Sequence, residues 1–481
     1  MNKNFRLSVF SSLRYNSAAK IFDALFTIIF GITMARILDP SVFGLLAIAS
    51  IFTGISAIFI DFGTGDAIIR YDEKKINNQF LSSIFWFNTL IGVFISIILI
   101  LLSGLIAQFF EKIIIQKIII IFSFNIIFAA MSNVPRSIIR KKLDFKSIFY
   151  ERIIILPISG IVGIKLALNG SGLWSVVLQQ IIVIVGGTLL IIHLSKWRPN
   201  FSFKIDHIND IFHFSSYLSG TKILNYFTKK GDLFLIGKFI GDYQLGIYSK
   251  GYQLTVKMLK TINGIIIGVL FPSISKFKND HEKLRLSFIR VSEVIFSIYG
   301  FIFLIGYLYS EILVRIILGH KWQDLSPLIP IFLLLALFFG FSSIGSHYLK
   351  ALGRTKILFR VVLFTSIFTL ISFIVGINWG IIGVASGYLI STILLSFILI
   401  FKSAMILNID IKNYLPIFMR ETCVFIFTAL IIKLFIYKIL FHSEIIYLVG
   451  GIFTALFIQY LYHFLFDTFL YKSSKEFISL K

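Results

Sequence analysis

The chain has 481 residues, of which 57% are hydrophobic and 14% are charged, and its mean hydropathy is +0.90. No soluble core needs that much apolar surface, and apolar runs of about 20 residues recur from end to end, the length that crosses a bilayer as a helix. The net charge of +23 lies mostly in short connectors, which is typical of membrane topology and does not favour nucleic-acid binding. The single cysteine, Cys423, excludes a disulfide framework or a cysteine-ligated metal site.

Fourteen membrane-spanning helices are predicted from these apolar runs. In chain order they cover residues 17–38, 42–60, 80–102, 113–134, 148–168, 172–194, 211–238, 245–272, 287–309, 325–349, 357–377, 379–401, 414–437 and 444–466. No cleavable signal peptide is expected, because the first apolar run is too long for one and no cleavage site follows it.

Positive charge alternates from one connector to the next. One set of connectors, together with both termini, carries about thirty Lys and Arg residues, and the other set carries about nine. Because basic connectors stay on the cytoplasmic side, we predict that both termini are cytoplasmic.

Short motifs recur about 202–210 residues apart and in the same order, which indicates an internal duplication. Lys20–Asp23 (KIFD) aligns with Lys222–Asn225 (KILN), and Phe43–Leu45 (FGL) aligns with Leu245–Ile247 (LGI). An even number of spans in each copy gives both copies the same orientation, and parallel repeats of this kind bind substrate between the two halves.

The duplication divides the chain into three predicted parts. They are an N-terminal six-helix bundle over residues 1–200, its repeat over 201–402, and two additional transmembrane helices over 403–481. We therefore expect an all-α, polytopic fold with two parallel bundles around a central cavity.

Lysine residues recur inside the seventh and eighth predicted helices, at spacings that place them on one face of each helix. The polar positions of these two faces are Lys222, Asn225, Lys229, Lys230, Lys250, Gln253, Lys257 and Lys260. Charge at bilayer depth costs about 2.5–3.5 kcal/mol per residue, so such groups face water, protein or a charged substrate. With Lys20 in the first helix, they predict a cationic cavity that binds an anionic phosphate headgroup. For Lys250 and Lys222, snorkelling to the lipid headgroups is the alternative.

Two acidic residues are candidates for coupling transport to protons or sodium ions. Asp23 lies three residues after Lys20, so a structural salt bridge between them is the alternative to coupling. Asp61 ends the second predicted helix, where a helix-end turn is the alternative. Glu151 follows the start of the fifth helix and is interpreted as interfacial.

Catalytic and cofactor motifs are not found in the sequence. The eight histidines show no ligand spacing, and nothing resembles a phosphate loop, a nucleophile–base pair or a dinucleotide fingerprint. We therefore expect no metal, no cofactor and no enzymatic activity.

Several motifs, taken in order, resemble a known family. Arg36–Pro40 (RILDP), then Phe43–Leu45 (FGL) and Asp61–Gly63 (DFG), are similar to the opening of polysaccharide-export (O-antigen, Wzx-type) flippases of the multidrug/oligosaccharidyl-lipid/polysaccharide exporter superfamily. Further stretches agree with the same pattern: Arg140–Lys146, Phe271–Ile274, Leu318–Trp322 and Pro327–Leu328.

The resemblance implies two six-helix bundles, two extra C-terminal helices and a multi-pass location in the bacterial inner membrane. It implies translocation of an undecaprenyl-diphosphate-linked oligosaccharide by alternating access, with Lys222, Lys229, Lys257 and Lys260 in the positions that fit a cationic lumen. The implied partners are that lipid-linked oligosaccharide and membrane lipids, with a polysaccharide polymerase and a chain-length regulator as further candidates and no nucleic acid.

Three other functions stay open at this point. A lipid II-type flippase fits the sequence almost as well, whereas a drug exporter of the same superfamily favours an acidic cavity over lysines. An integral-membrane polysaccharide polymerase requires a large outward loop, and the longest predicted one, about residues 310–324, is short.

Overall fold

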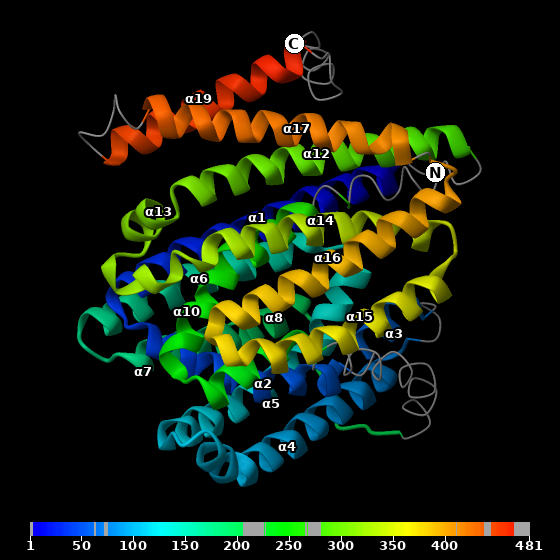
Figure 1. Cartoon of the computed structure of the whole chain (residues 1–481). Coiled ribbons are helices and arrows are strands. Elements are labelled where there is room, and N and C mark those ends of the chain that lie inside the picture. The colour runs from blue at the N-terminus through cyan, green and yellow to red at the C-terminus, as the bar shows by residue number, and fades with distance from the viewer. Residues whose placement is uncertain are drawn as a thin grey trace. The chain divides into compact units, whose positions relative to one another are not determined.

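The computed structural model (Figure 1) describes residues 3–61, 64–71, 76–204, 226, 228–264, 267, 280–409, 411–436 and 444–465. Within these residues the chain is helical and contains no β-strand, which confirms the all-α prediction. The chain forms two compact units, Met1–Ser249 (unit 1) and Lys250–Lys481 (unit 2).

Unit 1 is built from long helices that follow each other closely in sequence. They are α1 (Lys3–Ile37), α2 (Pro40–Asp61), α3 (Thr64–Arg70), α4 (Asn78–Phe109), α5 (Ile113–Lys141), α6 (Phe145–Leu168), α7 (Leu173–Ile181), the π-helical η2 (Ile182–Gly186) and α8 (Gly187–Ser195). A helix over residues 228–239 follows, and most of α10 (Asp242–Tyr252) belongs to the same unit.

Unit 2 begins in the last turn of α10, which continues through the π-helical η3 (Gln253–Lys257). The remaining elements are α12 (His281–Leu308), α13 (Ser310–Ile317), the 3₁₀-helix η4 (His320–Leu325), α14 (Leu328–Ala351), α15 (Thr355–Gly376), η5 (Ile377–Trp379), α16 (Gly380–Ile406), α17 (Ile411–Ile431), the π-helical η6 (Ile432–Ile436) and α19 (Glu444–Leu465).

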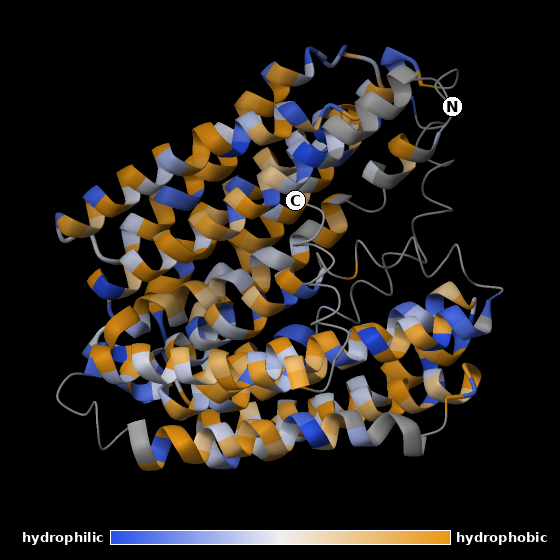
Figure 2. Cartoon of the chain, turned by 90° about the horizontal axis from the view of Figure 1, so that it is seen from above, coloured by the Kyte–Doolittle hydropathy of each residue, from blue (hydrophilic) through white to orange (hydrophobic). Residues whose placement is uncertain are grey.

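Nine stretches of the described residues are long and apolar enough to cross a membrane. One of them, Thr355–Ile406, is 52 residues long and contains two predicted spans, which are separated at Gly380 with its φ of +66°. The predicted seventh span, 211–238, lies largely outside the described residues. Large apolar side chains remain exposed along the helices, for example Leu101 and Phe453, as lipid contact requires, and Figure 2 shows hydrophobic colouring over most of the helix lengths.

Three helices begin at acidic or amide side chains that cap them. Asn77 Oδ1 accepts a 2.7 Å hydrogen bond from the Phe80 amide before α4, and Asp144 caps α6 through Ser147. Asp280 accepts from the Lys283 amide before α12. Side-chain caps of this type satisfy amide groups that the first turn of a helix leaves unpaired, so the sequence itself sets these helix starts.

The core of unit 1 includes a cluster in which α3 packs against α4 and α5. Its buried residues include Ile68, Phe85 and Val134. Lys141, at the end of α5, donates to the carbonyls of Ile68, Ile69 and Tyr71 and so caps the C-terminus of α3. A residue that the sequence places among connector charges therefore holds two helices together.

In unit 2, α17 and α19 pack against each other, and α17 packs against α12. Leu304, Tyr309, Ile432 and Ala455 form the buried centre of this contact. A Cβ at Gly300 of α12 would lie only 2.4 Å from the ring of Phe425, so the absence of a side chain there allows α12 and α17 to approach closely.

Candidate functional site: buried and aromatic-bound charges in the two units

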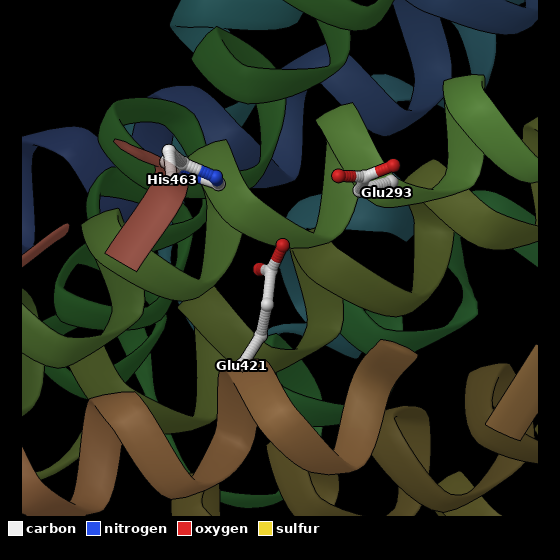
Figure 3. A group of neighbouring side chains, drawn as sticks. All are labelled: Glu293, Glu421 and His463. Carbon is white, nitrogen blue, oxygen red and sulfur yellow. The ribbon is translucent and has the colours of Figure 1, made fainter. Parts of the chain in front are cut away.

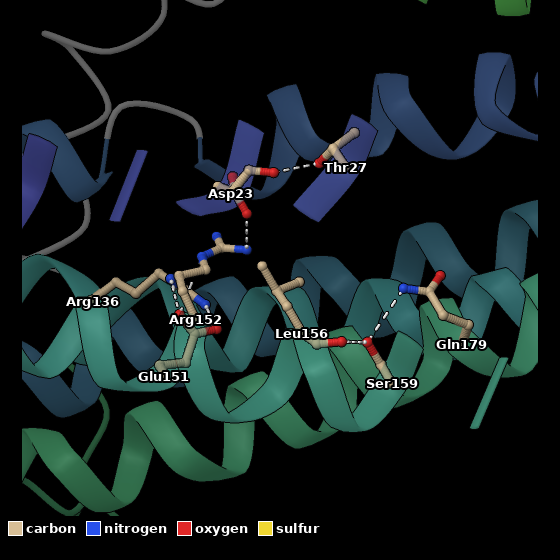
Figure 4. Close-up of polar contacts among 8 residues, drawn as sticks. All are labelled: Asp23, Thr27, Arg136, Glu151, Arg152, Leu156, Ser159 and Gln179. Atoms are coloured by element: carbon tan, nitrogen blue, oxygen red, sulfur yellow. Dashed lines mark hydrogen bonds and ion pairs between the residues drawn. The ribbon is translucent and has the colours of Figure 1, made fainter. Parts of the chain in front are cut away.

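A charge network lies between three helices of unit 1 (Figure 4). Glu151 of α6 accepts hydrogen bonds from both terminal nitrogens of Arg136 of α5, at 3.0 and 3.4 Å. Arg152 lies 3.4 Å from Glu151 through its Nε and 3.5 Å from Asp23 of α1 through its Nη1. The network therefore joins α1, α5 and α6 through alternating positive and negative charges.

Glu151, which is interpreted from the sequence as interfacial, is enclosed by protein, and its depth in the membrane stays a prediction. Its side chain is only 2% exposed, and the packing of α5 and α6 encloses it. Arg136 and Arg152 lie within α5 and α6 and neutralise this carboxylate. A Cβ at Gly187 of α8 would lie 2.7 Å from Glu151 Oε1, so the glycine leaves room for the carboxylate.

Asp23, the predicted ion-coupling residue, pairs with Arg152. Within the described residues the ion pair formed by Asp23 is with Arg152, and the Lys20 side chain is exposed on α1. Asp61 is the last residue of α2, and its side chain lies outside the described part. The assignment of either aspartate to ion coupling stays a prediction.

The first predicted lysine face is described only in part. Lys222 and Asn225 lie outside the described residues, Lys229 is exposed and Lys230 is half-buried. Asp232, two residues further on, is buried and accepts a 3.0 Å hydrogen bond from Tyr248 Oη of α10 and one from the Leu233 amide. This carboxylate therefore fixes α10 against the helix over residues 228–239.

The second lysine face is divided among three environments. Lys250 is only 2% exposed, so the snorkelling alternative for this residue is wrong. Gln253 is half-buried and Lys257 is exposed. The π-helix η3 lies between Lys250 and Lys260 and changes the register of the helix. Short π-helical segments interrupt regular spacing and occur often at functional sites.

Lys260 is held by aromatic side chains of unit 2. Its Nζ donates a 2.9 Å hydrogen bond to Tyr252 Oη and lies 3.3 Å from the centre of the Phe339 ring. Tyr388 of α16 stacks on Tyr252 and packs edge-to-face against Phe339. An ammonium group over an aromatic face is attracted by about 0.5–2 kcal/mol, more where water is excluded. The sequence shows Lys260 as a lysine within an apolar run, but nothing in it indicates that Tyr252 and Phe339 contact this side chain.

Each unit thus contains cationic groups that belong to helices within the bilayer span predicted from sequence. In unit 1 Arg136 and Arg152 neutralise the buried carboxylate of Glu151, and in unit 2 the ammonium group of Lys260 lies over aromatic rings. Ammonium and guanidinium groups of this kind can bind phosphate oxygens through charge-assisted hydrogen bonds.

The fold defines a class of proteins when it is compared with solved structures. The chain superposes on an inward closed lipid II flippase MurJ with a TM-score of 0.71 and 18% identity, covering 94% of this chain and 98% of that one. It also superposes on an inward-facing multidrug resistance MATE family transporter with a TM-score of 0.63 and 13% identity, covering 80% of this chain and 94% of the other. The chain has the fold shared by these multi-pass membrane transporters.

The sequence identifies the family within that class. Residues 33–327 match the polysaccharide biosynthesis protein family, and the chain belongs to it. The lipopolysaccharide biosynthesis protein WzxC of Escherichia coli (strain K12) is 26% identical over 380 residues, which is 76% of each chain. These findings confirm the resemblance seen in the sequence and place the protein in the inner membrane as a multi-pass protein.

Proposed function

We propose that the protein is a flippase that translocates an undecaprenyl-diphosphate-linked oligosaccharide across the inner membrane by alternating access. Two separate observations support the two halves of this proposal. The polysaccharide family supports a saccharide-bearing cargo, and the fold shared with flippases and transporters supports movement of that cargo through the membrane. The family match over residues 33–327 carries the proposal, because the fold alone is shared by exporters of different cargoes.

The proposed architecture has fourteen spans, cytoplasmic termini, a six-helix bundle over 1–200, its repeat over 201–402 and two added helices over 403–481. A reciprocal contact in unit 1 supports the duplication. A Cβ at Gly44 would lie 1.8 Å from the Asp242 carbonyl oxygen, and one at Gly246 would lie 1.8 Å from the Pro40 carbonyl oxygen. Gly246 follows Gly44 by the repeat offset, and Asp242 follows Pro40 by the same offset, as expected when a two-fold axis relates two repeats.

The basic groups are proposed to lower the cost of moving a diphosphate through the bilayer. Phosphate oxygens must lose water on the way, and fixed ammonium groups offset that loss by charge-assisted hydrogen bonds. We assign this substrate-binding role to Lys20, Lys222, Asn225, Lys229, Lys230, Lys250, Gln253, Lys257 and Lys260. The aromatic contacts of Lys260 support its part in the assignment, because they hold the ammonium group in a fixed position between the rings of Phe339 of α14 and Tyr252.

A transport assay in proteoliposomes tests both the function and the site. The purified protein is reconstituted with undecaprenyl-diphosphate-linked oligosaccharide, and the lipid that reaches the outer leaflet is captured by a membrane-impermeant lectin. We expect the combined Lys229→Ala, Lys257→Ala and Lys260→Ala variant to translocate at least about tenfold more slowly, since each hydrogen bond to a charged group contributes about 1.5–3 kcal/mol. Lys117→Ala, which removes an exposed lysine of α5, is the matched control and should keep the normal rate.

The possible results separate the function from the site. If vesicles with the unaltered protein show the same rate of lectin capture as protein-free vesicles, the flippase function is contradicted. A normal rate in the triple variant would leave the function standing and contradict the assignment of the lysines. Preferential export of a cationic dye over the lipid-linked oligosaccharide would favour a drug exporter, which the fold likeness to a multidrug transporter keeps as the second candidate.

A further inference from the structure

Three titratable side chains meet in unit 2, away from the lysines (Figure 3). Glu293 of α12, Glu421 of α17 and His463 of α19 each place one polar atom within 4.8 Å of the other two. The side chains are 9%, 1% and 8% exposed, respectively. The cluster joins the two C-terminal helices of the chain to α12, at the point where α17 packs against both neighbours.

Glu421 is the residue of this cluster that needs a ligand. Neither of its carboxylate oxygens accepts a hydrogen bond from any described residue, although both are buried. An ionised carboxylate in such a place has lost water without gaining a partner, which proteins avoid by pairing or by neutralising the group. Its side chain extends from α17 into the space between Glu293 and His463.

The histidine does not supply the missing positive charge. An amide N–H of Gln459 donates to Ser297 Oγ at 2.8 Å, and Ser297 Oγ lies 2.9 Å from His463 Nε2. The Gln459 amide nitrogen also lies 3.1 Å from Nε2 and can only donate. A donor-only group at this distance requires Nε2 to be the acceptor, and an imidazole that accepts at Nε2 is neutral.

Among the other charged and titratable groups of the three helices, Arg290 lies one turn before Glu293 on α12, Arg420 precedes Glu421 on α17, and Tyr462 precedes His463 on α19. The arginine side chains are exposed, and Tyr462 is buried beside the two carboxylates. A second carboxylate within a few ångströms favours binding of a proton by the buried Glu421. With Nε2 of the histidine already engaged by Ser297 and Gln459, a proton fits the site better than a metal ion.

We propose that Glu293, Glu421 and His463 form a proton-binding site that secures α17 and α19 to α12. When one of the two carboxylates binds a proton, the repulsion between them is removed. The protonated group then has an O–H that can donate a hydrogen bond. Release of the proton restores the repulsion and loosens the attachment of the C-terminal helix pair. This site is separate from the lysines and does not depend on what the protein transports.

Thermal unfolding of the purified full-length protein in nanodiscs, measured between about pH 5 and pH 8, tests the site. The unfolded protein releases the shared proton at lower pH than the folded protein, so stability should fall as pH rises, with a slope of about one proton. Glu421→Gln and Glu293→Gln should remove most of this slope and raise the unfolding temperature at about pH 8. Glu282→Gln, an exposed position on the same helix α12, should keep the normal slope.

Infrared spectroscopy of the unaltered protein gives a second readout that requires no variant to fold. A carbonyl band of a protonated carboxylic acid should disappear as pH rises, and Glu421→Gln should lack it. A slope in Glu421→Gln equal to that of the unaltered protein, or absence of the band at low pH, would overturn the proposal. So would a pH slope that vanishes with chelator and returns with zinc or sodium ions, because the ligand would then be a metal ion.

Discussion

Buried charge in unit 1 is paired within the protein and does not contact water freely. Glu151 has two arginine partners, and the bidentate contact with Arg136 fixes the orientation of both groups. Replacing a buried ion pair by apolar residues is often neutral, whereas removing one partner leaves an uncompensated charge. The network therefore affects the free energy of unfolding mainly when one charged partner is removed and the other stays buried.

Arg136→Leu should destabilise the protein strongly, by about 3–5 kcal/mol, because Glu151 then stays buried with Arg152 alone. The double variant Arg136→Leu with Glu151→Leu should recover most of this loss. The midpoint of thermal unfolding of the purified protein measures both effects. Lys283→Ala, which removes the solvent-exposed pair with Asp280, serves as control and should change the midpoint little.

Equal unfolding midpoints for Arg136→Leu and the double variant would contradict this account, because the penalty would then arise from lost packing and not from unpaired charge.

At the scale of elements, α2 and α10 approach each other more closely than side chains permit. Gly44 and Gly246 each lie where a Cβ would meet a backbone oxygen at 1.8 Å, and backbone cannot move aside as a side chain can. The ion pair between Lys112 and Asp242, 2.9 Å long, attaches the start of α10 to the residue that precedes α5. These two positions require glycine because of helix contact and not because of backbone conformation.

Gly44→Ala and Gly246→Ala should each destabilise the protein by about 1–3 kcal/mol, the usual cost of overpacking. Both substitutions separate the same two helices, so the double variant should cost less than the sum of the single variants. Unfolding midpoints of the three variants check this. Gly104→Ala, where a Cβ meets only the end of Gln116 at 3.6 Å, is the control and should be neutral or slightly stabilising.

Full additivity of the two single effects would show that Gly44 and Gly246 do not share one helix crossing.

At the scale of the whole molecule, the alternating charge of the connectors predicts which side of the membrane each one occupies. The described connectors that test this include Asn169 between α6 and α7, Gln323 in η4, Lys142 after α5 and Arg354 before α15. The first two belong to the sparsely charged set and the last two to the basic set.

In a Cys423→Ser background, Asn169→Cys and Gln323→Cys should react with a membrane-impermeant maleimide in intact cells with a permeabilised outer membrane. Lys142→Cys and Arg354→Cys should react only after the inner membrane is opened. Labelling is measured as a shift of the protein band on a gel. The reverse pattern would contradict cytoplasmic termini, and labelling of all four positions in the same condition would contradict the alternation of connectors between the two sides.

Much of this protein follows from the sequence by local rules. Apolar runs define the helices, and the capping residues Asn77, Asp144 and Asp280 mark three of their starts. Lysines within apolar runs indicate functional positions, and by the same rule Glu293 and Glu421 are acidic residues inside predicted spans. Each of these signals depends on neighbours within one or two helical turns.

The partners of the charged groups depend on the tertiary structure. Asp23 meets Arg152 across 129 residues of chain, Lys260 meets Phe339, and Glu421 meets His463. Hydropathy and helical periodicity determine which residues enter the membrane and which face of a helix they occupy. Which helices then pack together, and so which charge is paired, buried or left for a ligand, is determined by contacts between side chains far apart in sequence.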